Sequence, residues 1–243
     1  MSENNGKNAE STLRNHIAVV LDESGSMMAI RHEIMEAFNE QVAVIRESAT
    51  DQPTTISLVK FSTSVPDPVY WAEPVDVMRP LTAEDYAPHG LTAMLDAVGL
   101  TVDRLRALPD AEDEDTSFLV FVLSDGQENN SRRYSYGDIA ERIQSLEKTG
   151  RWTFAYMGAN QDLAHVSQDL GIPAANVMEF TSTSEGVKEG GYQAAESARS
   201  WVGKRRAGQK ADRSFFRPED DVAAPEAPDE PGAFWKGGTA RWR

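Results

Sequence analysis

A short stretch of the chain, residues 17–27, carries oxygen-bearing side chains at a spacing that suits metal binding. The apolar, β-branched-rich run from Ile17 to Leu21 predicts a strand that is buried on both faces of a parallel sheet. Asp22, Ser24 and Ser26 then alternate, so an extended turn aims all three side chains toward one point. One carboxylate and two hydroxyls, with no nearby histidine, suit a hard divalent cation, Mg²⁺ first, with Mn²⁺ and Ca²⁺ as alternatives.

Two segments further along the chain can complete this set of ligands. Thr92 lies just before a helical pattern, and Asp125 follows the apolar strand predicted over 118–123. In open α/β sheets, ligands bind at the carboxyl ends of strands, where both residues are expected. We therefore expect five ligands around one cation: Asp22, Ser24, Ser26, Thr92 and Asp125. Two alternatives are that these residues only cap strand ends and turns, or that the site has this shape without a metal.

The elements that must position these loops alternate between strands and helices. Strands are predicted over 17–21, 54–62, 65–71, 117–123, 152–157 and 176–180, and helices over 28–48, 93–108, 138–148, 161–170 and 184–206. In the last helix, Ser184 is the expected N-cap, and Gly190-Gly191 is expected to weaken or kink it. The fold class is therefore α/β, with a doubly wound, mostly parallel sheet, helices on both faces, and the proline-containing run 65–71 as an antiparallel edge strand.

In their order and spacing, the D-x-S-x-S run that begins at Asp22, the Thr92 loop and Asp125 resemble the von Willebrand factor A (vWA) domain with its metal-ion-dependent adhesion site (MIDAS). The resemblance covers about residues 15–201 and implies a Rossmann-like fold. It also implies that Ser24, Ser26 and Thr92 coordinate through their hydroxyls, and that Asp22 and Asp125 hold the ion directly or through water. Leu91 departs from the family pattern, which often has a second glycine there, and is expected to stiffen the Thr92 loop.

Composition limits the classes of protein that this chain can belong to. Its 243 residues, 40% of them hydrophobic, suffice for one sizeable core. A formal charge of −15 argues against nonspecific nucleic-acid binding, and the lack of cysteine excludes disulfides and thiolate metal sites. The polar N-terminus has no apolar core of a signal peptide, and no run has transmembrane length, so we expect a cytoplasmic protein without a membrane partner.

Shifts in composition divide the chain into three expected parts: a disordered N-terminal tail (1–14), a vWA-like domain (15–203) and a charged, aromatic-containing C-terminal arm (204–243). In the arm, a basic block at 204–217 precedes an acidic block at 219–230. The basic block is expected to lie on the acidic domain or to reach another subunit. The aromatic residues of the arm are expected to dock somewhere, since apolar aromatics in a charged arm usually do: Phe215, Phe216, Phe234, Trp235 and Trp242.

Several polar residues lie near the expected ligands. Glu23 and Glu128 are predicted to be solvated rim charges, and His89 is predicted to be a loop histidine rather than a ligand. Tyr134 and Tyr136 belong either to a rim that contacts a partner or to an ordinary loop.

These residues predict a non-enzymatic module that binds a partner protein through a divalent cation, with a partner Asp or Glu carboxylate in the open coordination position. The resemblance implies an AAA+ type ATPase or a component of a chelatase-like or stress-response assembly as partner, and a viral or phage structural role stays open. Two other functions also stay open. One is a structural assembly subunit that binds through its C-terminal arm. The other is a metal-dependent phosphohydrolase with Asp22 as nucleophile, although Ser24 stands where a second acid is expected.

Overall fold

The structure is a computed structural model that describes residues 13–209 and 211–216. Its strands are β1 (Arg14–Asp22), β2 (Thr54–Phe61), β3 (Tyr70–Pro74), β4 (Thr116–Ser124), β5 (Trp152–Gly158) and β6 (Val177–Glu179). Its α-helices are α1 (Arg31–Ser48), α2 (Met94–Arg106), α3 (Tyr136–Glu147), α4 (Leu163–Leu170) and α5 (Ser184–Arg206), and a 3₁₀ helix, Gly25–Ile30, precedes α1.

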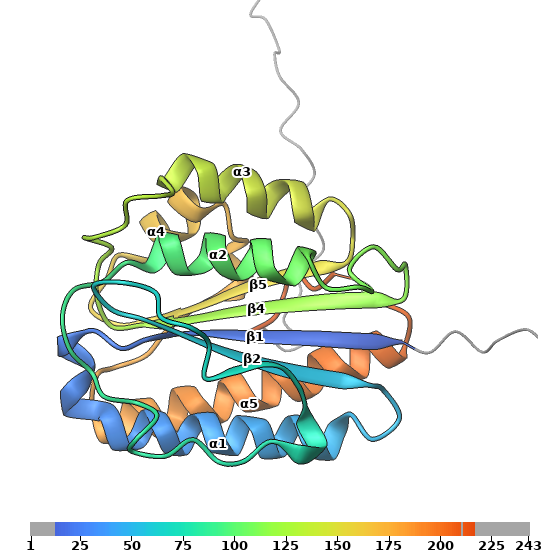
Figure 1. The fold of residues 1–243 in the computed structure, drawn as a ribbon, viewed down its shortest axis with the longest axis horizontal. Coiled ribbons are helices and arrows are strands. Elements are labelled where there is room, and N and C mark those ends of the chain that lie inside the picture. The colour runs from blue at the N-terminus through green and yellow to red at the C-terminus, as the bar shows by residue number, and fades with distance from the viewer. Residues whose placement is uncertain (1–12, 210, 217–243) are drawn as a thin grey trace, which may run out of the picture.

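Within the described residues, the strands form one sheet in the order β3-β2-β1-β4-β5-β6, with helices on both faces (Figure 1). Neighbouring strands are parallel except for β3, which runs antiparallel to β2 at one edge. Helices α1 and α5 cover one face, and α2, α3 and α4 cover the other (Figure 1). The predicted fold class, a doubly wound and mostly parallel sheet with one antiparallel edge, is confirmed.

The central strands β1 and β4 are buried because each contains an uninterrupted apolar run, residues 17–21 in β1 and 118–123 in β4. In β1 every residue after Arg14 is buried, and β4 is buried along its whole length. Since successive side chains of a strand point to opposite faces, Val19 and Leu21 pack in the core under α1 and α5, whereas Ala18 and Val20 pack under α2 and α3. A strand that is covered on both faces needs this continuous run rather than an alternating one.

Helix α5 is continuous from Ser184 to Arg206, across its glycine pair Gly190-Gly191. A Cβ atom at Gly191 would lie 2.7 Å from the Cβ of Ala37 in α1, so the glycine allows the two helices to approach closely. The N-cap is Thr183 rather than Ser184. Thr183 has extended backbone and its side chain accepts the Gly186 N–H, while Ser184 is already helical.

The antiparallel edge strand begins later than predicted, at Tyr70 rather than at residue 65. Pro66 and Pro68 precede it, and neither can donate a backbone hydrogen bond to the neighbouring strand. The ladder with β2 starts at the Leu58–Tyr70 pair, and its register shifts between Ile56 and Leu58. Proline chemistry therefore excludes the first part of the predicted run from the sheet.

Residues 211–216, which we assigned to the C-terminal arm, pack on the domain. Phe215 is 2% exposed and lies in the core under α1 and α5. Its N–H donates to Oδ1 of buried Asn176 (2.8 Å), and the Asp212 N–H donates to the Thr153 hydroxyl (2.9 Å). This segment therefore belongs to the folded domain, because a core side chain and buried hydrogen bonds hold it there.

The predicted domain boundary at residue 203 is accordingly too early. Residues 1–12 and 217–243 lie outside the described residues, and with them most of the predicted N-terminal tail and Trp235. Within the two described ranges, no helix is long and apolar enough to cross a membrane.

Phe215→Ala should lower the free energy of unfolding by about 3 kcal/mol, because it removes a fully buried aromatic side chain from the core. Phe216→Ala is the control and should cost less, since Phe216 is only partly buried. Urea unfolding of both variants measures the difference. A loss below about 1 kcal/mol for Phe215→Ala, the size of an average substitution, would contradict its place in the core.

Candidate metal centre

The two central strands bring the predicted carboxylates to the same edge of the sheet. β1 and β4 are parallel neighbours with Leu21 opposite Leu123, so the two strands end at the same edge of the sheet, near Asp22 and Asp125. The chain continues from β1 to β2 on one side, whereas β4 lies on the other side. Such a reversal of strand order opens a crevice at the carboxyl ends of the strands, where α/β proteins bind ligands.

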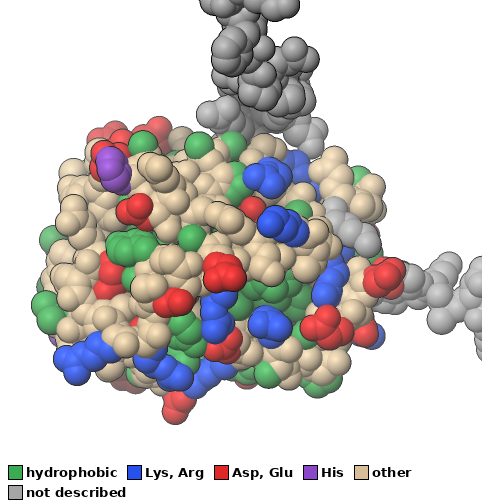
Figure 2. Space-filling view, turned by 90° about the horizontal axis from the view of Figure 1, so that it is seen from above, with side chains coloured by type: hydrophobic (Ala, Val, Ile, Leu, Met, Phe, Trp, Pro, Cys, Tyr) green, Lys and Arg blue, Asp and Glu red, His purple; other side chains and the backbone are tan. Residues whose placement is uncertain are grey.

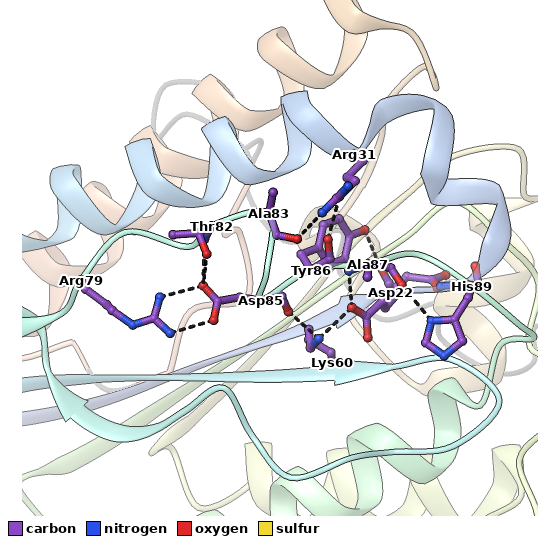
Figure 3. Close-up of polar contacts among 12 residues, drawn as sticks. Asp22, Arg31, Lys60, Arg79, Thr82, Ala83, Asp85, Tyr86, Ala87 and His89 are labelled. Atoms are coloured by element: carbon purple, nitrogen blue, oxygen red, sulfur yellow. Dashed lines mark hydrogen bonds and ion pairs between the residues drawn. The ribbon is translucent and has the colours of Figure 1, made fainter.

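The Asp22 carboxylate is fully buried and held in one orientation by hydrogen bonds. Its Oδ1 accepts the Ser24 N–H (2.7 Å), and its Oδ2 accepts the Ser124 hydroxyl (2.5 Å). The Tyr86 hydroxyl donates to the Asp22 carbonyl oxygen (2.6 Å; Figure 3). Ser124, the last residue of β4, received no role in the sequence analysis, although its position next to Asp125 at the strand end was a signal.

The hydroxyl groups gather beside the two carboxylates. Ser24 Oγ lies 3.1 Å from Ser26 Oγ, and the Ser26 hydroxyl donates to Asp125 Oδ1 (2.5 Å). A Cβ atom built on Gly126 would lie 3.4 Å from Thr92 Oγ1, 3.7 Å from Ser26 Oγ and 4.0 Å from Asp22 Oδ2. These three oxygens therefore surround one small space that the glycine leaves open. The structure thus brings together all five predicted ligands, which we call the metal centre: Asp22, Ser24, Ser26, Thr92 and Asp125.

The chemistry of this donor set fits a hard divalent cation. All five side chains present oxygen, and the space beside Gly126 is bounded by two hydroxyls and a carboxylate. Within residues 13–209 and 211–216, no three His, Asp or Glu side chains gather in a cluster that could hold a metal ion. A cation at this site would therefore depend on serine and threonine hydroxyls as well as on the two aspartates.

Burial shapes the electrostatics of the two aspartates. Desolvation raises the pKa of Asp22 to about 6, and the nearby Asp125 charge adds to the rise. Burial also raises the pKa of Asp125 above its ordinary value. Lys60 does not neutralise this pair, because its ammonium contacts Glu23 and the Asp85 carbonyl instead (Figure 3). A bound cation would remove the cost of keeping two carboxylates ionised here.

Glu23 is not the solvated rim charge that we predicted. It is 4% exposed, its Oε1 lies 2.7 Å from Lys60 Nζ, and the same oxygen accepts the Ala87 N–H (2.7 Å). The pair ties the loop around Ala87 to β1 and β2. Lys60, the single charged residue of the largely buried strand β2, was the signal in the sequence that an acidic partner lies nearby.

Glu128 is also not a rim charge, because it holds the N-terminus of α2. Its Oε2 accepts the Leu95 N–H (2.9 Å), and the adjacent Asn129 accepts the Thr92 N–H with its Oδ1 (3.0 Å). Gly90 turns the same loop with a φ of 76°, and a Cβ there would lie 2.3 Å from the Thr63 hydroxyl oxygen. The position of Thr92 therefore depends on the loop that follows Asp125, which sequence spacing cannot show.

The remaining residues near the centre have ordinary surroundings. His89 is exposed and its ring Nδ1 lies 2.8 Å from the Ala87 carbonyl oxygen, as suits a loop histidine. Tyr134 donates its hydroxyl to Asp103 (2.6 Å) and packs against Gly99 of α2, so it joins α2 to the loop before α3. Tyr136, by contrast, is 37% exposed.

Gly126→Ala should weaken Mg²⁺ binding by about tenfold or more, because the new methyl group would occupy the space between the ligand oxygens. Gly137→Ala in α3 is the matched control, since a Cβ there meets only Ser135 Oγ at 3.8 Å. Asp125→Ala should abolish binding. Isothermal titration of Mg²⁺ into metal-stripped protein measures all of them, and equal affinity in Gly126→Ala and Gly137→Ala would place the cation elsewhere.

Asp22→Asn should stabilise the metal-free protein at about pH 7.5 while removing metal binding. Because the Asp22 pKa is higher in the folded protein than in the unfolded chain, the stability of the metal-free protein falls as the pH rises from about 4 to about 6. The shift corresponds to at most about 3 kcal/mol, which the amide avoids. Urea unfolding of both proteins in EDTA at about pH 4 and at about pH 7.5 is the measurement. A variant that is less stable than the natural chain at about pH 7.5 would contradict the raised pKa of the buried Asp22 carboxyl.

No protein-family model and no curated protein matches the sequence, but solved structures do. The von Willebrand factor type A structure from Catenulispora acidiphila matches with a TM-score of 0.54 and 19% identity, over 79% of this chain and 43% of that one. Proximal thread matrix protein 1 (PTMP1) from the mussel byssus matches with a TM-score of 0.51 and 18% identity, over 78% of this chain and 46% of that one. The chain spans less than half the length of these structures. What they share with it is the architecture, so the chain has the fold of a von Willebrand factor A domain.

Proposed function

We propose that this chain is a non-enzymatic interaction module that binds a hard divalent cation, Mg²⁺ first, and through it a carboxylate of a partner protein. The observation that supports the proposal is the convergence of Asp22, Ser26 and Thr92 oxygens around the space beside Gly126. With only two carboxylates in the metal centre, a bound cation keeps enough positive charge to attract an Asp or Glu side chain into an open coordination position.

The residues of the metal centre are held in place before any ligand arrives. Asp22 is fixed by the Ser24 N–H and the Ser124 hydroxyl, and Thr92 is fixed through its backbone by Asn129. Ser26 is exposed, so the centre is open to a partner on that side. Such preorganisation lowers the entropy lost on binding and favours one geometry of the incoming carboxylate.

The negative charge of the chain would make the binding of an acidic partner depend on the metal. At a formal charge of −15, the protein repels an acidic partner when no cation is bound. The cation reverses the sign of the potential at one point, so association depends on both the metal and the partner carboxylate. The partner class, an AAA+ type ATPase or an assembly component, remains a proposal that follows from the family resemblance.

An enzymatic role for Asp22 is less well supported. A phosphohydrolase nucleophile needs a carboxylate oxygen that reaches the substrate. Both Asp22 oxygens already accept hydrogen bonds, and the residue is completely buried. The same contacts suit a carboxylate that orients a ligand set, and they favour the non-enzymatic function.

Selection from a random peptide library tests this function without a known partner. Peptides captured by the immobilised protein in Mg²⁺ and released by EDTA should share an Asp or Glu, because the cation needs an anionic ligand. Replacing that acid by Asn or Gln should abolish binding, and the Asp125→Ala protein should capture no such peptides. Captured peptides that lack an acid, or that stay bound in EDTA, would contradict the proposal.

A further inference from the structure

A groove with a volume of about 620 Å³ lies between α2 and α3 and includes none of the five residues of the metal centre. It extends from Arg106 at the end of α2 to Arg133 and Tyr134 in the loop before α3. Its lining includes the apolar side chains of Val102 and Leu146. Figure 2, which looks onto this layer, shows hydrophobic side chains at the bottom of a hollow, with charged side chains around it. We call it the α2–α3 groove.

The α2–α3 groove is basic in a chain that is otherwise strongly acidic. Four arginines line it, against three acids: Arg106, Arg133, Arg142 and Arg151, and Glu112, Asp138 and Glu141. Two of the arginines have acidic partners, since Arg142 pairs with Asp103 and Arg151 lies 3.4 Å from Glu112. Arg106 and Arg133, at opposite ends, form no ion pair with any residue in the described ranges. The groove therefore presents two available guanidinium groups on either side of apolar lining.

Shortly before its described part finishes, the chain passes the C-terminal end of α3, which borders the groove. Arg213 lies close enough to Glu147, the last residue of α3, for its charge to oppose the raised pKa of that carboxyl. Glu147 directly follows Leu146, which lines the groove. Phe216, the last described residue, packs under α1 and α5, so residues 217–243 are tethered to the same domain as the groove and are held at a high effective concentration relative to it.

The sequence beyond residue 216 complements the groove in charge and length. Residues 219–230 contain six acids and no base, with apolar residues between them at 222–224. An extended chain covers about 3.3 Å per residue, so this block spans up to about 40 Å. Helix α3, with its 12 residues, is about 18 Å long at 1.5 Å per residue. The block is therefore long enough to reach both Arg106 and Arg133.

We propose that the acidic block 219–230 docks in the α2–α3 groove of its own chain, with its carboxylates on Arg106 and Arg133 and its apolar residues on the apolar lining between them. Carboxylate–guanidinium hydrogen bonds supply orientation, and attachment to the same chain supplies a high effective concentration. The proposal is independent of the metal centre, whose residues take no part in it.

Paramagnetic broadening in the full chain tests this docking. Because the sequence has no cysteine, Ala224→Cys provides a single site for a nitroxide label. Amide signals of α2 and α3 should broaden, while those of α1 and α5, on the opposite face, should not. Adding Arg106→Glu and Arg133→Glu together should remove the broadening. Arg199→Glu, on the exposed surface of α5, is the control that should leave it unchanged.

Equal broadening of both helix layers would overturn the proposal, as would full broadening in the Arg106→Glu/Arg133→Glu protein. A mixture of isotope-labelled protein without the nitroxide and spin-labelled protein without the isotope distinguishes contact within one chain from contact between two copies. Broadening in this mixture that is as strong as in protein carrying both labels would assign the contact to a second copy and overturn docking within the chain. If the double variant does not keep the amide spectrum of α1 and α5, Asp220→Lys with Asp221→Lys tests the same contact from the other side and should equally remove the broadening.

Discussion

The candidate metal centre depends on one buried carboxylate at the end of the central strand β1. Asp22 follows an apolar run in a sheet that helices cover on both faces. Its side chain is therefore buried at the point where β1 ends. Hydrogen bonds from Ser24 and Ser124 offset part of the cost of this burial, yet its pKa stays raised. A buried carboxylate with a raised pKa destabilises the metal-free fold, and a bound cation would remove this cost.

The surrounding loops are organised so that hydroxyl groups meet that carboxylate. The chain leaves β1 through Ser24 and Ser26, while the loop with Thr92 is positioned from the far side of the site by the segment after Asp125. Because Gly126 has no side chain, the space beside these oxygens stays open. The buried oxygen atoms at this edge of the sheet therefore lower the stability of the fold. Binding sites commonly reduce stability in this way.

Sequence patterns predicted the sheet and the grouping of Asp22, Ser24 and Ser26 because both are local. The strand that ends at Asp22 is a continuous apolar run, and the alternation after it is visible without a structure. Glu23 and Glu128 were misjudged because their environment comes from partners far away in sequence, such as Lys60 and the Leu95 N–H. Phe215 was expected to dock, but its place in the core was not predicted for the same reason: its hydrogen-bond partner is Asn176 and its core neighbours lie on other elements. Periodicity reports which face of an element is buried, and it does not report which polar groups meet there.

The central claim is that a divalent cation occupies the space beside Gly126. Anomalous diffraction from crystals soaked in Mn²⁺ tests this directly, because the ion would be located against the protein rather than inferred from affinity. We expect one strong peak in contact with oxygens of Ser26 and Thr92, with Asp22 and Asp125 reaching it directly or through water. A fully soaked crystal with no peak there, or with its only strong peak outside the metal centre, would contradict the claim.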